Sequence, residues 1–418
     1  MNSSKKRVVV IGGGIMGLSS AIWLLRSGCA VTIVDPGIAR RPASFGNAGV
    51  LAACSVVPVT TPGLIRKAPL MLLDPGSPLF VRWSYLLKLM PWLVRYLKHA
   101  NATDAARIAR GLAPLTRDTF AQHKALAGGT AAERWLQSSG YVFAYESRAA
   151  FEADAFGWRL RREAGFTWQE FEGEALRELD PAFGPTIGFA IVVQDHGFVL
   201  SPGGYIAALR EVAAALGAIA EPAEARAFRL DADGSLQAVL TTNGDIEADA
   251  AVIATGAWSK GLTAQLGLDV PLETERGYHV MLCGPSLKPR QPTMVASGKF
   301  VATPMADGVR CAGIVEFGGL DLPAHKPPIE LILRQVKQAF PALTFTHHDE
   351  WLGHRPAPSD SLPLIGEVPR HRGIFLAFGH HHIGLTTGAK TGRLLAALVN
   401  GEGGEIDMTP YTPARFAA

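Results

Sequence analysis

Short apolar runs and a helix-like segment alternate at the start of the chain. Residues 7–11 form a β-branched run that is typical of a buried parallel strand, and a glycine turn follows directly. Residues 16–27 carry small and apolar side chains on one helical face, and Gly28 stands where a C′ glycine ends a helix. A second apolar run, residues 31–34, ends at Asp35. The pattern predicts a strand–helix–strand unit at the beginning of the chain.

The rest of the chain mixes strands and helices and contains no internal repeat. Ser201 followed by Pro202 predicts an N-cap and first helical position, with the helix running to about residue 216. Further elements are predicted as a buried strand at 250–254, a strand-rich stretch at 270–320, a helix at 328–339, a strand at 374–378 and a helix at 386–400. This mixture favours an α/β or α+β protein rather than an all-helical or all-strand one.

Composition excludes several classes of protein. The chain has 418 residues, of which 48% are hydrophobic, and this length predicts two or three domains. The net charge is only +3 and the basic residues are scattered, which argues against a nucleic-acid-binding protein. Four cysteines occur without a CxxC spacing, so we predict free thiols in a reducing compartment and no metal site.

The N-terminal apolar run is too short to act as a secretion signal or a membrane anchor. It is interrupted at once by glycines 12–14, which serve a turn, so we interpret it as a strand. No uncharged apolar stretch approaches the roughly 18 residues that span a bilayer. These features predict a cytoplasmic protein.

The first turn carries a dinucleotide-binding pattern. Gly12, Gly14 and Gly17 follow a strand and open a helix, and Asp35 ends the next strand about 20 residues later. Gly12 permits a tight turn, Gly14 permits close approach of a pyrophosphate to the helix N-terminus, and Gly17 permits close helix–strand packing. Asp35 is placed to accept hydrogen bonds from ribose hydroxyls. The spacing and its context predict a bound dinucleotide, either FAD or NAD.

A second motif favours FAD. Residues 251–258 form an apolar strand that ends in Ala-Thr-Gly, about 240 residues after the first glycine turn. In flavoproteins with a two-part dinucleotide domain such a strand returns to the cofactor late in the chain, whereas an NAD dehydrogenase has no need of it.

Four blocks together resemble the D-amino acid oxidase superfamily of flavoproteins. They are the first glycine turn, residues 44–49 (SFGNAG), residues 254–259 (ATGAWS) and the run from Trp351 to Thr386 that contains GHRP and a glycine- and histidine-rich turn. Within the superfamily the chain is most similar to the bacterial D-amino acid dehydrogenases and D-hydroxyproline dehydrogenases. The blocks span almost the whole chain, and their order and spacing are more specific than any one of them.

The resemblance implies a Rossmann-like FAD-binding domain interleaved with a substrate domain built on an antiparallel sheet. We predict that residues 1–60, 190–265 and 350–418 form the FAD-binding domain, and that residues 61–189 and 266–349 form the substrate-binding domain. The loop 44–49 is expected beside the isoalloxazine ring. It contains no histidine or cysteine suited to covalent attachment, so the FAD is expected to be non-covalent.

The resemblance also implies site residues. The predicted cofactor-binding residues are Gly12, Gly14, Ile15, Met16, Gly17, Asp35, Ser44, Asn47, Ala48, Gly49, Thr255, Gly256, Trp258, Gly379, Gly384, Leu385 and Thr386. Arg355 matches the arginine that binds the substrate carboxylate, and a guanidinium fork suits a carboxylate because it donates two parallel hydrogen bonds. Tyr278 and His380 complete the predicted catalytic set.

Several of these assignments leave alternatives open. Tyr278 is predicted either to contact the substrate or to pack in the core. The three histidines 380–382 are predicted to be a packed turn or a flavin or substrate contact, since adjacent histidines cannot easily ligate one metal ion. Arg310 and Glu316 are an even number of residues apart, so we expect them on one face of a strand, either lining the pocket or as a surface pair.

The predicted reaction is oxidative deamination of a small amino acid, of the D-amino acid or D-proline and hydroxyproline type. Hydride transfer from Cα to flavin N5 would give an imino acid and then a 2-oxo acid. One alternative is a glycine- or sarcosine-type secondary-amine oxidase that uses oxygen. Another is an FAD-binding subunit of a multisubunit complex without activity of its own. The predicted electron acceptor is a quinone, an electron-transfer partner or oxygen.

Residues 80–98 raise a separate hypothesis. Aromatic and basic residues alternate there around an apolar face, which suits peripheral contact with the inner face of the cytoplasmic membrane. The alternative is a helix that packs over the active site as part of the substrate domain.

Overall fold

A mostly parallel sheet, with strands from both ends of the sequence, forms the centre of one half of the molecule. The computed structural model describes residues 5–37, 42–74 and 76–417, and the predicted domain segment 1–60 therefore lies partly outside the described residues. The strands of the six-stranded sheet, in spatial order, are β18 (Leu364–Glu367), β19 (Ile374–Phe378), β12 (Ala250–Ile253), β1 (Arg7–Ile11), β2 (Ala30–Val34) and β8 (Ile219–Glu221). All neighbours are parallel except β18 and β19, as expected for a dinucleotide-binding sheet.

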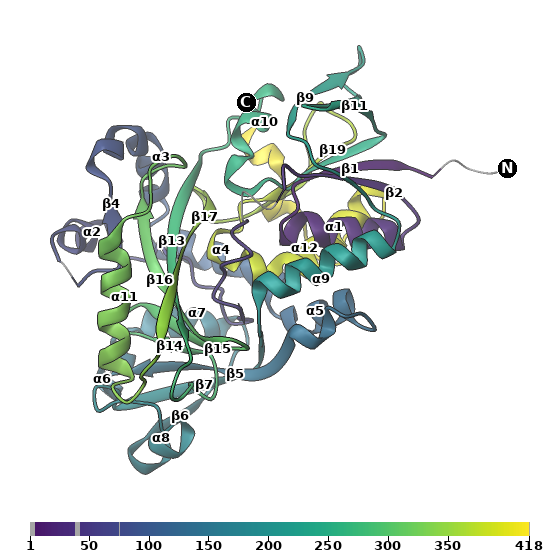
Figure 1. Cartoon of the computed structure of the whole chain (residues 1–418). Coiled ribbons are helices and arrows are strands. Elements are labelled where there is room, and N and C mark those ends of the chain that lie inside the picture. Colours follow the sequence, from purple (N-terminus) through teal and green to yellow (C-terminus); the bar gives the residue numbers. More distant parts are fainter. Residues whose placement is uncertain (1–4, 38–41, 75, 418) are drawn as a thin grey trace.

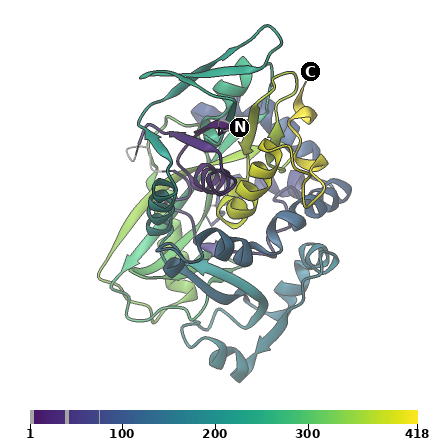
Figure 2. The same ribbon diagram turned by 90° about the vertical axis from the view of Figure 1, so that its right-hand side faces the viewer.

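Alternation along β1 explains the three layers around this sheet. Val8 and Val10 belong to a core shared with three helices, while Val9 and Ile11 belong to a core shared with a small antiparallel sheet. The helices are α1 (Ile15–Arg26), α9 (Pro202–Ala215) and α12 (Gly384–Val399), and the small sheet consists of β9 (Ala225–Leu230), β10 (Leu236–Thr241) and β11 (Gly244–Glu247). Figure 2 shows α12 in yellow beside α1 in purple, although they are separated by most of the sequence.

A larger mixed sheet forms the second half. Its main path is β17 (His347–Pro358), β13 (Leu272–Cys283), β16 (Gly308–Phe317), β15 (Phe300–Met305), β14 (Thr293–Val295), β5 (Leu136–Tyr145), β7 (Phe189–Val199) and β3 (Val50–Leu51), with β4 (Leu79–Val81) on β16 and β6 (Gln169–Glu172) on β7. Most of its pairs are antiparallel, as predicted for the substrate-domain sheet. Helix α11 (Lys326–Ala339) covers its outer face (Figure 1). The mixed α/β fold that the sequence predicts is therefore confirmed.

Eight further α-helices lie among the described residues. They are α2 (Leu64–Leu73), α3 (Leu86–Lys98), α4 (Ala102–Thr116), α5 (Thr119–Ala127), α6 (Arg148–Ala153), α7 (Ala155–Glu163), α8 (Gly173–Leu179) and α10 (Lys260–Gln265). The predicted cap of α9 is confirmed, since the Ser201 hydroxyl accepts a hydrogen bond from the Gly204 amide at 3.2 Å. The segment 80–98 is a strand, a short turn of helix at Trp83–Tyr85 and α3, rather than one helix.

Sheet membership suggests domain boundaries that differ from those expected. Strands β7 and β17 both belong to the large sheet, so the chain leaves that sheet near residues 199 and 358 instead of 190 and 350. Leu115 of α4 and Leu126 of α5 share the core of α1 and α12, although they fall in the predicted substrate domain. We propose boundaries that follow the sheets, with α4 and α5 assigned to the FAD-binding half.

A β-bulge reverses the face on which one strand presents its side chains. In the pairing of β13 with β16, His279 lies opposite Ala312 but Gly277 lies opposite Val315, so β16 contains one extra residue there. The even spacing of Arg310 and Glu316 therefore places them on opposite faces, and both are buried. The expectation of one shared face was wrong, because alternation holds only where the ladder is regular.

Candidate active site

An elongated cavity of about 1130 Å³ connects the two sheets. One end is formed by the glycine turn after β1 and by Asp35, and the other end contains Arg355. Its volume slightly exceeds the usual range for ligand pockets, roughly 300–1,000 Å³. A long cofactor together with a small substrate would fill a cavity of this size.

The glycine turn is shaped so that side chains are excluded. Gly12 has φ +112°, and a Cβ on it would lie 2.6 Å from the Ala254 carbonyl oxygen. A Cβ on Gly17 would lie 1.8 Å from the Gly12 carbonyl oxygen. Gly14 is the extended N-cap residue of α1. The backbone amides at the start of α1 thus remain accessible to a diphosphate, as the sequence predicts.

Asp35 is held at the end of β2 by two backbone amides. Its Oδ2 accepts a hydrogen bond from Gly13 N at 2.6 Å, and its Oδ1 accepts one from Gly37 N at 2.9 Å. Each carboxylate oxygen has a second lone pair, so the side chain keeps capacity to accept hydrogen bonds from ribose hydroxyls.

Ser44 lies at a different end of the cofactor cavity from the one we expected. Its hydroxyl accepts a hydrogen bond from Ile15 N at 3.1 Å, which places it at the N-terminus of α1. This is the end of the cavity that the glycine turn forms, where we predict the diphosphate. No local sequence pattern indicates this contact, because it joins residues 29 apart through the path of the loop.

The loop 44–49 is held in place by the large sheet. Arg310 donates hydrogen bonds to the carbonyls of Phe45 and Asn47, at 3.4 and 2.8 Å. Burial lowers the pKa of Arg310 to about 10, so it remains a cation near neutral pH. His279 Nδ1 donates to the Gly46 carbonyl at 2.7 Å. Arg310 therefore positions the loop rather than lining the cavity or forming a surface pair.

The C-terminal segment returns to the cavity at the start of α12. Gly384, Leu385 and Thr386 line it, and the Thr386 hydroxyl bonds to the backbone of Val50 and Ala52 at 3.2 and 3.3 Å. The positive end of the α12 dipole therefore faces the cavity, where it can stabilise negative charge. Thr255, Gly256 and Trp258 line the opposite wall, at the end of β12.

Most of the predicted cofactor-binding residues line the cavity. The exceptions are Gly17, Gly49 and Gly379, which act through the backbone. Gly49 has φ +81° and Gly379 has φ +89°, and a Cβ on either would come within 2.6 Å of a neighbouring side chain. These glycines shape the loops that carry the lining residues.

Arg355 projects from β17 into the cavity. Its Nη1 and Nη2 donate to the carbonyls of Ile314 and Gly313, at 3.3 and 3.1 Å, at the β-bulge of β16. The guanidinium lies over Gly277, where a Cβ would approach its Cζ to 2.3 Å. Burial lowers the pKa of Arg355, while the charge of Glu275 acts to raise it. The side chain is thus oriented by the backbone and still directed into the cavity, as a carboxylate anchor requires.

Tyr278 does not direct its hydroxyl toward Arg355. The hydroxyl donates to Glu316 Oε2 at 2.8 Å and accepts from His325 N at 3.0 Å, and the ring belongs to the core beneath α11. Because β13 alternates, Gly277 and Tyr278 face opposite sides of the sheet. Tyr278 lines the cavity as well as packing in the core, so its position is compatible with both predicted roles, although its hydroxyl is bonded to Glu316 and His325.

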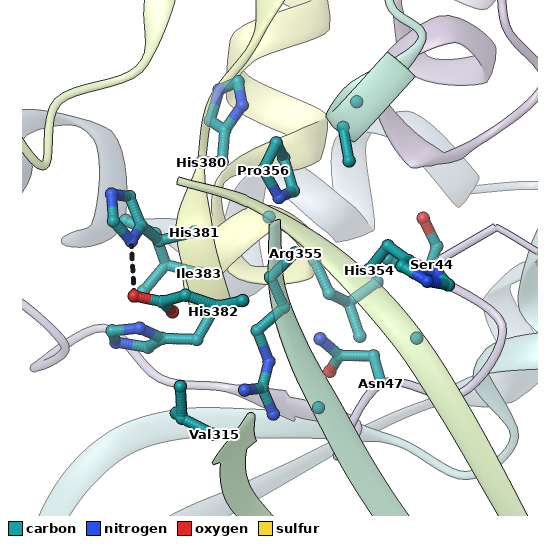
Figure 3. A pocket seen from close by; sticks show the side chains of 18 of the residues that line it. Ser44, Asn47, Val315, His354, Arg355, Pro356, His380, His381, His382 and Ile383 are labelled. Atoms are coloured by element: carbon teal, nitrogen blue, oxygen red, sulfur yellow. Dashed lines mark ion pairs between the residues drawn. The ribbon is translucent and has the colours of Figure 1, made fainter. Parts of the chain in front are cut away.

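The three histidines point in different directions (Figure 3). His380 points away from Arg355, is 2% exposed, and its Nε2 lies 3.1 Å from the Thr391 hydroxyl. His381 Nε2 donates to the Pro358 carbonyl at 3.0 Å, and its Nδ1 lies 3.6 Å from Glu275. His382 lies toward Arg355 and lines the cavity. All three histidines line the cavity, and His382 is the one that lies toward Arg355, so the role predicted for His380 stays a prediction.

Comparisons with known proteins agree with this geometry. The family model described as FAD dependent oxidoreductase matches residues 7–398. The chain belongs to this family. A D-amino-acid oxidase of Bradyrhizobium diazoefficiens is 41% identical over 98% of this chain and 99% of its own length. A D-amino acid dehydrogenase of Allorhizobium ampelinum is 27% identical over 99% of both chains. Glycine oxidase of Geobacillus kaustophilus shares the fold, with a TM-score of 0.78, 23% identity, and coverage of 99% of this chain and all of the other.

This member of the FAD-dependent oxidoreductases has site residues that sequence reasoning missed. Tyr96 of α3 and Glu275 of β13 both line the cavity, and neither stands in a recognised motif. The one signal for Glu275 is an acidic residue inside a buried strand. Its position opposite Arg355 follows from the β13–β17 register. Tyr96 depends on how α3 packs, which no local pattern reveals.

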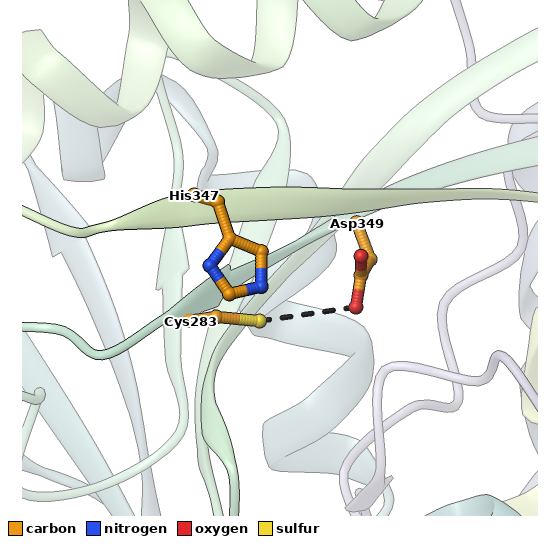
Figure 4. A group of neighbouring side chains, drawn as sticks. All are labelled: Cys283, His347 and Asp349. Atoms are coloured by element: carbon orange, nitrogen blue, oxygen red, sulfur yellow. Dashed lines mark hydrogen bonds between the residues drawn. The ribbon is translucent and has the colours of Figure 1, made fainter.

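Three potential metal ligands also meet outside the cavity. Cys283, His347 and Asp349 come from paired strands, and their ligand atoms lie within 4.8 Å of one another (Figure 4). The Cys283 thiol lies 3.8 Å from Asp349 Oδ2, and burial, with the Asp349 charge, raises the pKa of this thiol. The thiol therefore stays protonated in the free protein. Local cysteine spacing carries no sign of this group, because the pairing of β13 with β17 brings together residues that are distant in the sequence.

Among the described helices, none combines the length and the hydropathy needed to cross a bilayer.

Proposed function

We propose that the protein oxidises D-amino acids to imino acids, which water hydrolyses to 2-oxo acids and ammonia. The observation that carries this proposal is one continuous cavity, with the dinucleotide turn at one end and the inward-directed Arg355 at the other. The names of the relatives that are 41% and 27% identical support the D-amino acid as substrate.

The residues of the chain position rather than transform the substrate. When bound, FAD accepts the two electrons that leave the substrate Cα. Arg355 binds the carboxylate through its fork and fixes the orientation of Cα. The N-terminus of α12 would hold the end of the cofactor nearer to Arg355 and would stabilise negative charge there. Asp35 and the glycine turn hold the far end.

The test is direct reduction of the purified yellow protein. D-alanine and L-alanine are mixed anaerobically with the holoprotein, and the flavin absorbance is followed. We expect bleaching by the D-enantiomer, and about a hundredfold or greater loss of kcat/KM in Arg355→Ala, since a charge-assisted bidentate contact is removed. A colourless protein that takes up no FAD, or an Arg355→Ala variant with unchanged KM, would contradict the proposal.

The same assay separates the alternatives. Preferential bleaching by sarcosine, glycine or proline would favour a secondary-amine oxidase. Protein that binds FAD but is reduced by no amino acid would favour a subunit of a larger complex. Hydrogen peroxide formed in air identifies oxygen as the acceptor, and reduction of a quinone analogue without peroxide identifies a dehydrogenase. Acid precipitation that releases all flavin would confirm non-covalent FAD.

We also propose that the face formed by α2 and α3 contacts the inner surface of an anionic membrane. Several of its apolar side chains are strongly exposed, namely Ile65, Leu70, Trp83, Leu87, Met90 and Val94. The exposed basic residues Lys88, Arg95 and Lys98 lie on the same helix, which complements anionic lipid. The opposite side of α3 packs over the cavity. Contact with a membrane and packing over the active site, the two roles predicted for residues 80–98, are therefore compatible.

Co-sedimentation with vesicles tests this contact. We expect binding to vesicles that contain phosphatidylglycerol, weaker binding to pure phosphatidylcholine, and loss of binding in Leu87→Glu. Leu216→Glu is the matched control, because Leu216 is also exposed but lies at the end of α9. Equal sedimentation of both variants would show that α3 is not the contact.

A further inference from the structure

Three polar side chains at the Arg355 end of the cavity have no assigned role. Tyr96 comes from α3, Glu275 comes from β13, and His382 comes from the short 3-10 helix His381–Ile383. All three side chains line the same cavity as Arg355. Arg355 can only donate hydrogen bonds, whereas each of these three side chains has an oxygen or nitrogen that can accept one. Donor and acceptor groups therefore face the same space.

Tyr96 has a buried hydroxyl that lacks a partner. The residue is 4% exposed, and its hydroxyl makes no hydrogen bond with any of the described residues. Trp92 stacks on its ring with centroids 4.4 Å apart, and Trp92 Nε1 donates to the Ala357 carbonyl at 2.9 Å. Tyr96 is thereby fixed to the strand that carries Arg355. A polar group held so rigidly without a partner points to a ligand.

Glu275 supplies a negative charge beside Arg355. The two residues lie opposite each other in the β13–β17 ladder, so both side chains project from the same face. Burial opposes ionisation of Glu275, but the hydrogen bond and charge of His381, with the charge of Arg355, hold the pKa of Glu275 below its usual value. It is therefore a carboxylate at neutral pH.

His382 supplies a neutral ring. Its side chain is open to the cavity but enclosed by the surrounding protein, and this desolvation lowers its pKa to about 4, with Glu275 acting to raise it and His381 and Arg355 acting to lower it further. Near neutral pH one ring nitrogen is therefore free of a proton and can accept a hydrogen bond.

We propose that Tyr96, Glu275 and His382 form an amine subsite, which accepts hydrogen bonds from the α-ammonium group of the amino acid whose carboxylate Arg355 binds. This proposal rests on the proposed function and deepens it. A primary ammonium group has three N–H donors for three acceptors, whereas the nitrogen of proline or sarcosine has only two. The subsite therefore selects zwitterionic primary amino acids over secondary amines.

Two ligands that the enzyme cannot oxidise test the subsite apart from catalysis. 2-Methylalanine carries a carboxylate and a primary amine but has no hydrogen on Cα, and 2-methylpropanoate has the same skeleton without the amine. Their binding to the holoenzyme is measured by isothermal titration calorimetry. N-methyl-2-methylalanine serves as the secondary-amine ligand.

We expect wild-type protein to bind 2-methylalanine more tightly than either other ligand. Tyr96→Phe should weaken binding of 2-methylalanine about 3- to 10-fold, and Glu275→Gln about 10-fold or more. Binding of 2-methylpropanoate should change less than about twofold in Tyr96→Phe. Tyr85→Phe is the matched control, because Tyr85 lies outside this cavity with its hydroxyl on Glu273.

A structural role would give a different pattern. Because Tyr96→Phe removes an unpaired buried hydroxyl, the ligand-free holoenzyme should melt at the same temperature or slightly higher. Equal weakening of both ligands, or equal affinity of the wild type for 2-methylalanine and 2-methylpropanoate, would overturn the proposal. Failure of D-alanine to bleach the flavin would instead refute the proposed reaction, while the binding comparison would still report on the subsite.

Discussion

Gly277 lies directly beneath the guanidinium of Arg355 and has no side chain of its own, so Gly277→Ala tests the anchor role sharply. The new Cβ would lie 2.3 Å from both Cζ and Nη2 of Arg355 and 2.8 Å from Nε. Carbon atoms pack at about 3.5 Å or more, so the guanidinium must retreat by more than about 1 Å. Its hydrogen bonds of 3.1 and 3.3 Å to Gly313 and Ile314 would then be lost.

The expected loss is large for activity and small for stability. A displacement of about 1 Å costs roughly a hundredfold in rate, which is about 2.7 kcal/mol of transition-state stabilisation. The atoms that must move are the end of a flexible side chain, and alanine is favoured over glycine in a strand by roughly 0.5–1 kcal/mol. We therefore expect kcat/KM for D-alanine to fall about a hundredfold while the melting temperature changes by less than about 3 °C.

Steady-state kinetics and thermal unfolding of the holoprotein check both parts. Gly403→Ala is the matched control, because a Cβ there meets nothing within 4 Å. If Gly277→Ala retains kcat/KM within about threefold of wild type, the reasoning that Arg355 must stay in this position is wrong. If the variant unfolds, the overlap between the new Cβ and the guanidinium was relieved by movement of the backbone and not of the Arg355 side chain. The expectation of a nearly unchanged melting temperature would then be wrong.

Three further predictions concern the cofactor and the response to pH. Gly17→Ala should yield protein without bound FAD, as judged by flavin absorbance after gel filtration, because its Cβ would lie 1.8 Å from the Gly12 carbonyl oxygen; retention of stoichiometric FAD would refute this. Arg310→Met should keep the fold but weaken FAD binding about tenfold in fluorescence titrations, because the carbonyls of the 44–49 loop lose the hydrogen bonds from a buried cation. Unchanged affinity for FAD would show that the loop does not need these hydrogen bonds. Burial lowers the pKa of His123 and His196 to about 4, and the pKa of His279 and His380 to about 3. In the unfolded chain the same histidines titrate near pH 6.5. As the pH falls below that value, the unfolded chain therefore binds more protons than the folded protein. Stability should therefore fall by about 1 kcal/mol per histidine between pH 6.5 and 5.5, in thermal unfolding at a series of pH values, and His123→Gln should reduce that slope.

Local sequence determined the parts of this protein whose geometry is set within a few residues. The strand, turn and helix around Gly12 and Gly17, the acid at Asp35, and the cap at Ser201 all follow from backbone sterics and short-range hydrogen bonds. The order of the motifs along the chain was sufficient to predict the family, the cofactor and the mixed fold. Arg355 could be named because its motif is contiguous.

Tertiary structure alone decided which side chains share the active site. The extra residue in β16 reversed the faces of Arg310 and Glu316, and such a bulge shows itself only once the partner strand is known. The chain turns at His381, which has φ +46°, and His382 lies toward Arg355 whereas His380 points away from it. Tyr96 and Glu275 meet near Arg355 through the packing of α3 and the pairing of β13 with β17. Contacts of this kind depend on register and packing between distant segments, and periodicity within one segment carries no information about either.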